Sequence, residues 1–139
     1  MARRKEAIKL VEQEEKCGCA VACIAMVLGT TYADVRKDWQ NDFENEGVTT
    51  AQIIDYLGNV GFAAVYKRIS HWTHKDFVRE EMLTPFAPIH ILSVRPAYDS
   101  KNYHVVVMDA EGVLYCPSRL TDEESRRSYL IDEVIGLYK

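Results

Sequence analysis

The most distinctive hydrophobic pattern of the chain is an unbroken run of small and apolar residues from Ala20 to Leu28, which ends at Gly29. Alanine, methionine and leucine favour a helix, and a glycine directly after such a run is a common C-cap. The run therefore predicts a short, buried helix. Cys19 stands at or just before its first turn, behind a polar segment at 13–18.

Two later segments have apolar residues at helical spacing. In the first, Tyr32, Val35 and Trp39 follow an i, i+3, i+7 pattern behind a candidate N-cap, Thr31. The second is expected to begin after Thr49 or Thr50 and to end at Gly61, with an apolar face made of Ile53, Ile54, Leu57 and Val60. Three helices are therefore expected in the first half of the chain.

The second half has the shorter apolar runs that predict strands. Residues 62–69 alternate in part between apolar and polar side chains, and residues 87–94 are apolar enough to be buried on both faces of a sheet. Residues 103–109 and 113–118 flank a short turn and predict an antiparallel pair. We also expect a loop that becomes a short helix from about Thr73 or His74, an exposed polar segment at 119–127, and a C-terminal short helix and final edge strand within 129–139. Helices first and an antiparallel sheet afterwards define the α+β class.

Length and composition limit the function. A chain of 139 residues with 47% hydrophobic and 27% charged residues is an ordinary globular composition, so we expect a single domain, 1–139. The net charge of −4 and the lack of a long basic run favour neither nucleic acid nor a membrane surface as a partner. No apolar run approaches the roughly 20 residues of a membrane span. We expect a cytoplasmic protein with reduced cysteines, no membrane span and no cofactor.

Cys19 is the leading candidate for a reactive group. A helix N-terminus has unpaired N–H groups and a partial positive charge, which stabilise a thiolate. Gln13 can fold back beside the sulfur and form an oxyanion hole with the backbone N–H of Cys19. Two other interpretations remain open, namely a buried core cysteine, which fits Cys23 better, and a metal site with Cys17, although its spacing lacks a second C-x2-C half.

A nucleophilic cysteine needs a histidine as its base, and His104 is the best placed of the four histidines. It opens the strand 103–109 directly after a polar loop, where a neutral imidazole can take the thiol proton. His90 lies inside an apolar strand and is expected in the core. His71 and His74 have no nearby acids and are expected at the surface.

The group that orients the imidazole depends on the register of the hairpin. A three-residue loop, Ala110–Gly112, pairs Asp109 with Val113 and puts Cys116 and Ser118 on the face of His104. A shift of one residue turns them away. Asp109 itself is expected at the far end of the strand, on the opposite face.

These motifs together resemble a known family. Gln13-x5-Cys19, the run AVACIAMVLG, the segment EGVTTAQIIDYLGNVGFAAVYKR, and APIHILSV followed by NYHVVVMD and GVLYCPS are similar, in this order, to the bacteriocin-leader-processing or double-glycine peptidases. The resemblance covers roughly residues 10–118 and implies a papain-like cysteine peptidase fold. It implies Cys19 as nucleophile, His104 as general base and Gln13 in the oxyanion hole.

The chain departs from the family pattern at three positions. Ala20 replaces the glycine after the nucleophile, and Gly18 replaces an acidic or polar residue before it. The Asp-Pro pair that carries the orienting aspartate reads Cys116-Pro117 here, and a thiol is a poor orienting group for an imidazolium. Activity is then reduced, or Ser118, a carbonyl or a water substitutes, or cleavage is lost.

The leading interpretation is therefore a cysteine peptidase. The resemblance implies cleavage after Gly-Gly, and the same groups also serve deamidases and acyltransferases. The alternatives are an impaired domain that binds a peptide or protein partner, and a metal or redox site using Cys17, Cys19, Cys23 and Cys116. The chain has no G-x4-GK[ST] phosphate loop. We thus expect a free-standing domain of bacterial or phage origin, which serves a separate transporter or another partner protein.

Overall fold

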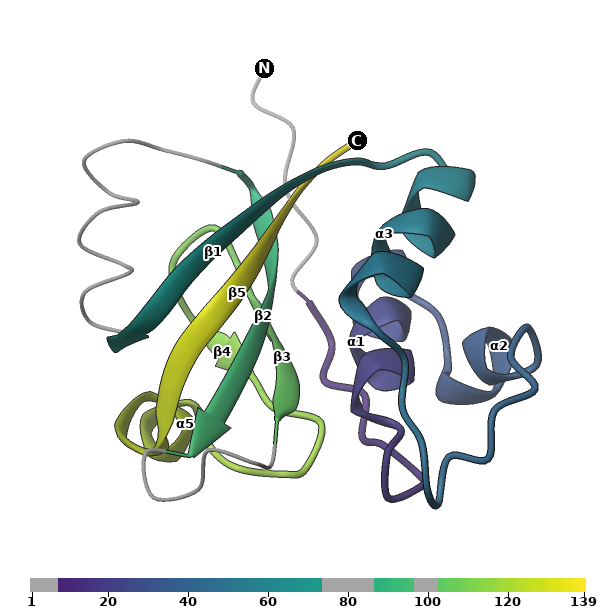
Figure 1. Cartoon of the computed structure of the whole chain (residues 1–139), viewed down its shortest axis with the longest axis horizontal. Coiled ribbons are helices and arrows are strands. Elements are labelled where there is room, and N and C mark those ends of the chain that lie inside the picture. The colour runs from purple at the N-terminus through teal and green to yellow at the C-terminus, as the bar shows by residue number, and fades with distance from the viewer. Residues whose placement is uncertain (1–7, 74–86, 97–102) are drawn as a thin grey trace.

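The fold was analysed in a computed structural model, which describes residues 8–73, 87–96 and 103–139. Its helices are α1 (Cys19–Leu28), α2 (Tyr32–Arg36), α3 (Thr50–Asn59) and α5 (Asp122–Ser128). Its strands are β1 (Ala63–Thr73), β2 (Ile89–Pro96), β3 (His104–Met108), β4 (Leu114–Tyr115) and β5 (Tyr129–Tyr138). The predicted α+β class is confirmed, with α1, α2 and α3 gathered beside the sheet (Figure 1).

The strands form one five-stranded sheet in the order β1-β5-β2-β3-β4, and every neighbouring pair is antiparallel. The sheet therefore joins β1, which follows the helices directly, to the later hairpin of β3 and β4 only through β5 and β2. Helix α5 lies at the end of the sheet where β5 begins (Figure 1).

The predicted helix ends are largely those of the structure. Gly29 caps α1 with φ 70°, a left-handed conformation that glycine adopts without steric cost. Thr49 and Gln52 form a capping box at the start of α3, where each side chain bonds the other's backbone N–H. Helix α2 has only five residues, shorter than the predicted segment, and Thr31 caps it as expected.

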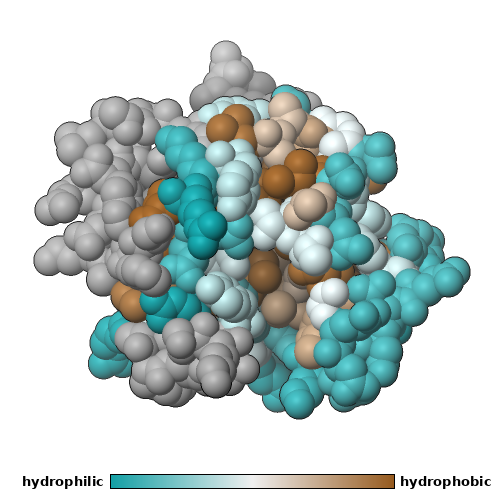
Figure 2. All heavy atoms as spheres, in the orientation of Figure 1, coloured by the Kyte–Doolittle hydropathy of each residue, from teal (hydrophilic) through white to brown (hydrophobic). Residues whose placement is uncertain are grey.

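Apolar side chains fill both faces of the sheet. On the helix side, α1 packs through Val21 and Ile24 against a group from three strands, Ile91, Val107 and Ile135. The opposite face carries a second cluster, which includes Leu92, Val94, Val106, Leu114, Cys116, Tyr129 and Val134. In Figure 2, apolar residues gather along the junction between sheet and helices. This junction is where a site between α1 and the sheet must lie.

Two expectations for the C-terminal part of the chain were wrong. Residues 119–127 are not merely an exposed polar segment, because Thr121 and Glu124 form a capping box that starts α5. Residues 129–139 do not form a helix and an edge strand, because β5 is a ten-residue strand inside the sheet. Its side chains enter both apolar clusters, Ile135 on the helix side and Val134 on the opposite face, and a strand buried on both faces lacks simple alternation.

Strand β1 also differs from its prediction, because it continues to Thr73 and so includes His71, which was expected in a loop. The expected short helix after Thr73 or His74 lies outside the described residues, and so does His74 itself. Strand β4 is shorter than predicted, with two residues. Among the described residues, no helix has the length and apolar character that crossing a membrane requires.

Candidate active site

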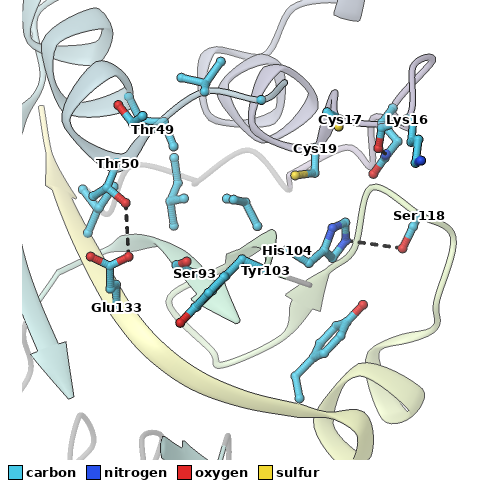
Figure 3. Close-up of a pocket in the computed structure, with 18 residues that line it drawn as sticks. Lys16, Cys17, Cys19, Thr49, Thr50, Ser93, Tyr103, His104, Ser118 and Glu133 are labelled. Carbon is cyan, nitrogen blue, oxygen red and sulfur yellow. Dashed lines mark hydrogen bonds between the residues drawn. The ribbon is translucent and has the colours of Figure 1, made fainter. Parts of the chain in front are cut away.

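A cleft of about 740 Å³ lies between the N-terminal end of α1 and the sheet. Its lining includes three residues singled out from the sequence: Gln13, Cys19 and His104. Figure 3 shows Cys19 and His104 facing the same cleft, one from the helical side and one from the sheet. The fold thus brings together a thiol and an imidazole that are far apart in the sequence.

Cys19 is the first residue of α1 and is partly exposed. Gly18 precedes it as N-cap and has no side chain to compete for the N–H groups of the first turn. The partial positive charge of the helix end therefore acts directly on the Cys19 sulfur. Packing is a second reason for a glycine at this N-cap, because a Cβ at Gly18 would lie 2.1 Å from the hydroxyl oxygen of Tyr32.

Tyr32 belongs to a polar cluster with Glu15 and Arg36, close to the start of α1. Its hydroxyl donates to Glu15 Oε1 at 2.8 Å, and Arg36 Nε donates to the same oxygen at 2.7 Å. The hydrogen bond from Arg36 holds the pKa of Glu15 below its usual range. Arg36 also donates to the carbonyls of Trp39 and Asn41, so this one guanidinium links Glu15 to the segment that follows α2.

The other cysteines of the N-terminal region differ from Cys19. Cys17 is partly exposed and also lines the cleft, and its backbone N–H donates to the carbonyl of Phe43 at 2.7 Å. Cys23 is fully buried and donates to the carbonyl of Val105 at 3.3 Å. Burial raises the pKa of the Cys23 thiol well above its ordinary value. Cys23 is thus a core residue, as its place in the apolar run indicated.

His104, the first residue of β3, is held from its Nε2 side. This nitrogen lies 3.3 Å from Cys116 Sγ and 3.3 Å from Ser118 Oγ. Burial lowers the pKa of His104, but hydrogen bonds with Cys116 and Cys19 and the charges of both sulfurs outweigh it and raise the pKa to about 9. The imidazole is therefore a cation at neutral pH.

Cys116 lies in a buried position surrounded by donors. Besides His104, its sulfur contacts Ser118 Oγ at 3.1 Å and the hydroxyl of Tyr129 at 3.6 Å. Burial raises the pKa of Cys116, but the hydrogen bonds from His104 and Ser118, the imidazolium charge and the Tyr129 contact outweigh it and lower the pKa to about 6. The two shifts together favour a Cys116 thiolate beside a His104 imidazolium.

This arrangement follows from the hairpin register predicted from the three-residue loop. Met108 pairs with Leu114, and the N–H of Asp109 donates to the carbonyl of Val113 at 3.0 Å. The sequence left open whether Cys116 can hold an imidazolium, because a neutral thiol is a weak partner. The ionised sulfur removes that objection, since a thiolate accepts charge-assisted hydrogen bonds as a carboxylate does.

Gln13 lines the cleft, and its amide group is hydrogen-bonded to the loop that leads to Cys19. Its Nε2 donates to the carbonyls of Glu15 at 3.0 Å and Lys16 at 2.9 Å, which turn inward ahead of Cys19. Its Oε1 is buried and has no hydrogen-bond partner in the described part of the chain. In this conformation the amide thus holds the loop before Cys19 in place, and both of its N–H groups are engaged.

The remaining candidates lie away from the cleft. His90 is buried in β2, and burial lowers its pKa to about 4, so its imidazole is neutral. Asp109 caps the turn by accepting from two backbone N–H groups and the Tyr115 hydroxyl. Within residues 8–73, 87–96 and 103–139, no three His, Cys, Asp or Glu side chains gather as a metal ion requires.

Two cleft residues were missed by the sequence analysis. Tyr129, which contacts Cys116, and Glu133, which lines the far end of the cleft, both come from β5. No local motif marks either residue. Only the central position of β5 in the sheet brings them here, and that position was not predicted.

The chain, with helices packed beside an antiparallel sheet, Cys19 at the start of α1 and His104 at the start of β3, has the fold of solved double-glycine peptidase domains. It superposes on a double-glycine-motif protease from an AMS/PCAT transporter in complex with the leader peptide, with TM-score 0.62, 18% identity, and coverage of 94% of this chain and 91% of that one.

Two further solved structures are similar. The peptidase domain of Streptococcus mutans ComA, in complex with a small-molecule inhibitor, gives TM-score 0.61 and 14% identity, with 94% of this chain and 99% of that chain covered. The peptidase domain of Streptococcus ComA, a bi-functional ABC transporter of a quorum-sensing pathway, gives TM-score 0.56 and 19% identity, with 94% of this chain and 98% of that chain covered. No protein-family model matches the chain, and no curated protein matches it in sequence. The likeness is therefore one of fold.

Proposed function

We propose that the protein is a cysteine peptidase that cleaves a peptide amide bond, with Cys19 as nucleophile and His104 as acid and base. The observation that carries the proposal is the Nε2 of His104 held 3.3 Å from the Cys116 sulfur in the cleft that Cys19 also lines. With Nε2 so engaged, Nδ1 is the ring nitrogen left for Cys19. Cys116 is then a positioning residue, a thiolate in the place of the family's orienting aspartate.

In the proposed mechanism, the Cys19 proton resides on His104 before the substrate binds. The thiolate attacks the carbonyl carbon, a C–S bond forms, and the π electrons move to oxygen. The backbone N–H of Cys19 donates to this oxyanion, and Gln13 adds a second donor when one of its two carbonyl bonds is exchanged. The C–N bond then breaks and His104 gives its proton to the amine. Water, deprotonated by His104, hydrolyses the thioester and restores the thiolate.

The peptide substrate has support from one of the similar structures, which holds a leader peptide. By analogy we propose a peptide with a Gly-Gly cleavage site, supplied by a partner protein or a separate transporter. Deamidation and acyl transfer use the same acyl-enzyme with a different attacked amide or acceptor, so they remain chemical variants of this proposal.

A second candidate, a domain that binds a peptide without cutting it, is favoured by the state of Gln13. Both amide bonds of Gln13 go to loop carbonyls, so the oxyanion hole lacks its side-chain donor in this conformation. Loss of one such donor costs about 10²–10³-fold in rate in other hydrolases. A domain of this kind would retain the cleft and its affinity for a peptide.

The deciding experiment is alkylation by iodoacetamide between pH 5 and 9, with each cysteine quantified by peptide mass spectrometry. Cys17 is an internal control, because it lines the same cleft with similar exposure but has no imidazole partner in the proposal. We expect Cys19 to react at pH 6 at least about tenfold faster than Cys17, and His104→Ala to remove the difference. Equal rates for the two cysteines in the parent protein would refute the nucleophile assignment. A second assay then separates the peptidase from the binding domain. Cleavage of Gly-Gly peptides by the parent protein, and its absence in Cys19→Ala, would support the peptidase.

A further inference from the structure

The cleft holds a carboxylate that the proposed mechanism does not use. Glu133 of β5 is half-buried and lines the cleft. Figure 3 shows it beside Thr50, at the opposite end from Lys16, with Cys19 and His104 between the two charged residues. A peptide that passes the nucleophile therefore meets a carboxylate on one side and an ammonium group on the other.

Two neutral donors hold the carboxylate in place. Thr50 Oγ1 donates to Glu133 Oε1 at 3.3 Å, and the Tyr66 hydroxyl donates to Oε2. Arg68 lies directly opposite Glu133 in the β1–β5 register, but it forms no ion pair with it in the part of the chain that the structure describes. Each carboxylate oxygen retains capacity for a further hydrogen bond. Glu133 is thus a fixed negative charge that a cation can still reach from the cleft.

Two neighbouring side chains suit the same cation. Ser93 pairs with Glu133 across β2 and β5, and its hydroxyl borders the cleft as a hydrogen-bond acceptor. Tyr103, 60% exposed, extends between Glu133 and His104 in Figure 3. An aromatic ring face beside a carboxylate attracts ammonium and guanidinium groups more strongly than either group does alone.

We propose that Glu133, Ser93 and Tyr103 form a subsite for a lysine or arginine side chain of the peptide substrate. The inference rests on the proposed function, which supplies the peptide, and it makes Glu133 a specificity residue with no part in bond cleavage. Together with Lys16 it also fixes the direction of the peptide, because a positive side chain is attracted to one end of the cleft and repelled from the other.

The test uses Cys19→Ala protein, so that binding is measured without turnover. The probes are decapeptides with a central Gly-Gly in an otherwise alanine and serine sequence. A single lysine is moved through the remaining positions, and norleucine, which has a similar length but no charge, is the control at each one. Dissociation constants are measured by isothermal titration calorimetry. We expect lysine at one position to bind about five- to tenfold tighter than norleucine.

Glu133→Gln keeps the size of the side chain and should bring the lysine-to-norleucine ratio close to one. Glu111→Gln, which removes the same charge from the exposed hairpin turn, should leave the ratio unchanged. Tyr103→Leu changes an exposed side chain without touching the carboxylate, and should reduce the ratio about threefold.

A ratio below two at every position would overturn the subsite, and so would a ratio that persists in Glu133→Gln. Failure of all peptides to bind would overturn it as well, because its ligand is a peptide side chain. Cleavage by the parent protein is scored separately. If peptides bind with the lysine preference but are never cut, the subsite proposal holds and the peptidase proposal is refuted. If peptides are cut without the lysine preference, the peptidase proposal holds and the subsite proposal is refuted.

Discussion

The pairing of His104 with the Cys116 thiolate makes a prediction about the proton affinity of one imidazole. The pKa of His104 stands at about 9 against an ordinary 6.5. Each pKa unit corresponds to about 1.4 kcal/mol, so the site favours the imidazolium by about 3 kcal/mol. Cys116 and Cys19 share this effect, because both sulfurs raise the pKa and burial alone would lower it.

Cys116→Ala removes one of the two sulfurs, and we expect the pKa of His104 to fall by about 1–2 units. Cys116→Asp replaces the thiolate with another anion next to Ser118 and Tyr129, so the pKa should stay raised. Cys19→Ala should lower the pKa by a smaller amount, and the double variant should bring it to or below 6.5, since only burial then remains.

The assay is a pH titration of the imidazole signals by two-dimensional ¹H–¹⁵N NMR, with the His104 signal identified by its loss in His104→Ala. His90 is an internal control, because burial holds its pKa at about 4 and it lies outside the pair. A His104 signal that titrates near 6.5 in the parent protein would refute the ion pair. A raised pKa that is unchanged in Cys116→Ala would assign the effect to Cys19 instead.

The structure makes three further predictions. The folded-state pKa of His104 is raised to about 9, so the contribution of the imidazolium to the stability of the fold is lost as the pH rises through 9. The folded-state pKa of Cys116 is lowered to about 6, so the contribution of the thiolate is lost as the pH falls through 6. Urea unfolding of the parent and Cys116→Ala should therefore differ most, by roughly 2 kcal/mol, between pH 6 and 9, and a difference independent of pH would contradict this. Gly18→Ala brings a methyl group within 2.1 Å of the Tyr32 hydroxyl and should lower the free energy of urea unfolding by about 1–3 kcal/mol. The control Gly58→Ala lies in α3 with open space around it, and should raise the unfolding free energy by about 0.5–1 kcal/mol. Thr121→Ala removes the capping box of α5 and should lower the unfolding free energy by about 1 kcal/mol, and an unchanged value would mean that α5 does not depend on its cap.

The parts of the fold and site that the sequence predicted correctly are those encoded locally. Helix α1 ends at a glycine that can adopt positive φ, and α3 begins at a threonine with a glutamine three residues later. The register of β3 and β4 follows from the length of one turn, so the meeting of His104, Cys116 and Ser118 can be inferred from the amino-acid sequence alone.

The features that were missed depend on contacts between distant segments. Strand β5 pairs with β1 on one side and β2 on the other, and its side chains are buried in the apolar clusters on both faces, so it lacks the alternation that marks an edge strand. Tyr129 and Glu133 reach the cleft only through that pairing. The hydrogen bonds of the Gln13 amide could not be predicted either, because they depend on the path of the Glu15 and Lys16 carbonyls. Helix α5 is the exception, since its capping box was visible in the sequence.

The position of β5 has a consequence for the order of events during synthesis. Strand β1 is made early, and β2, β3 and β4 follow, yet β5 is the strand that lies between β1 and β2. In a nascent chain whose β5 is still inside the ribosome, β1 is separated from the sheet of β2, β3 and β4, and the edges of β1 and β2 that face β5 stay open until it inserts. Tyr129 also belongs to β5, so the Cys116 sulfur gains its Tyr129 contact in the same step. The hydrogen-bonding surroundings of Cys116 are thus complete only once β5 has taken its place between β1 and β2.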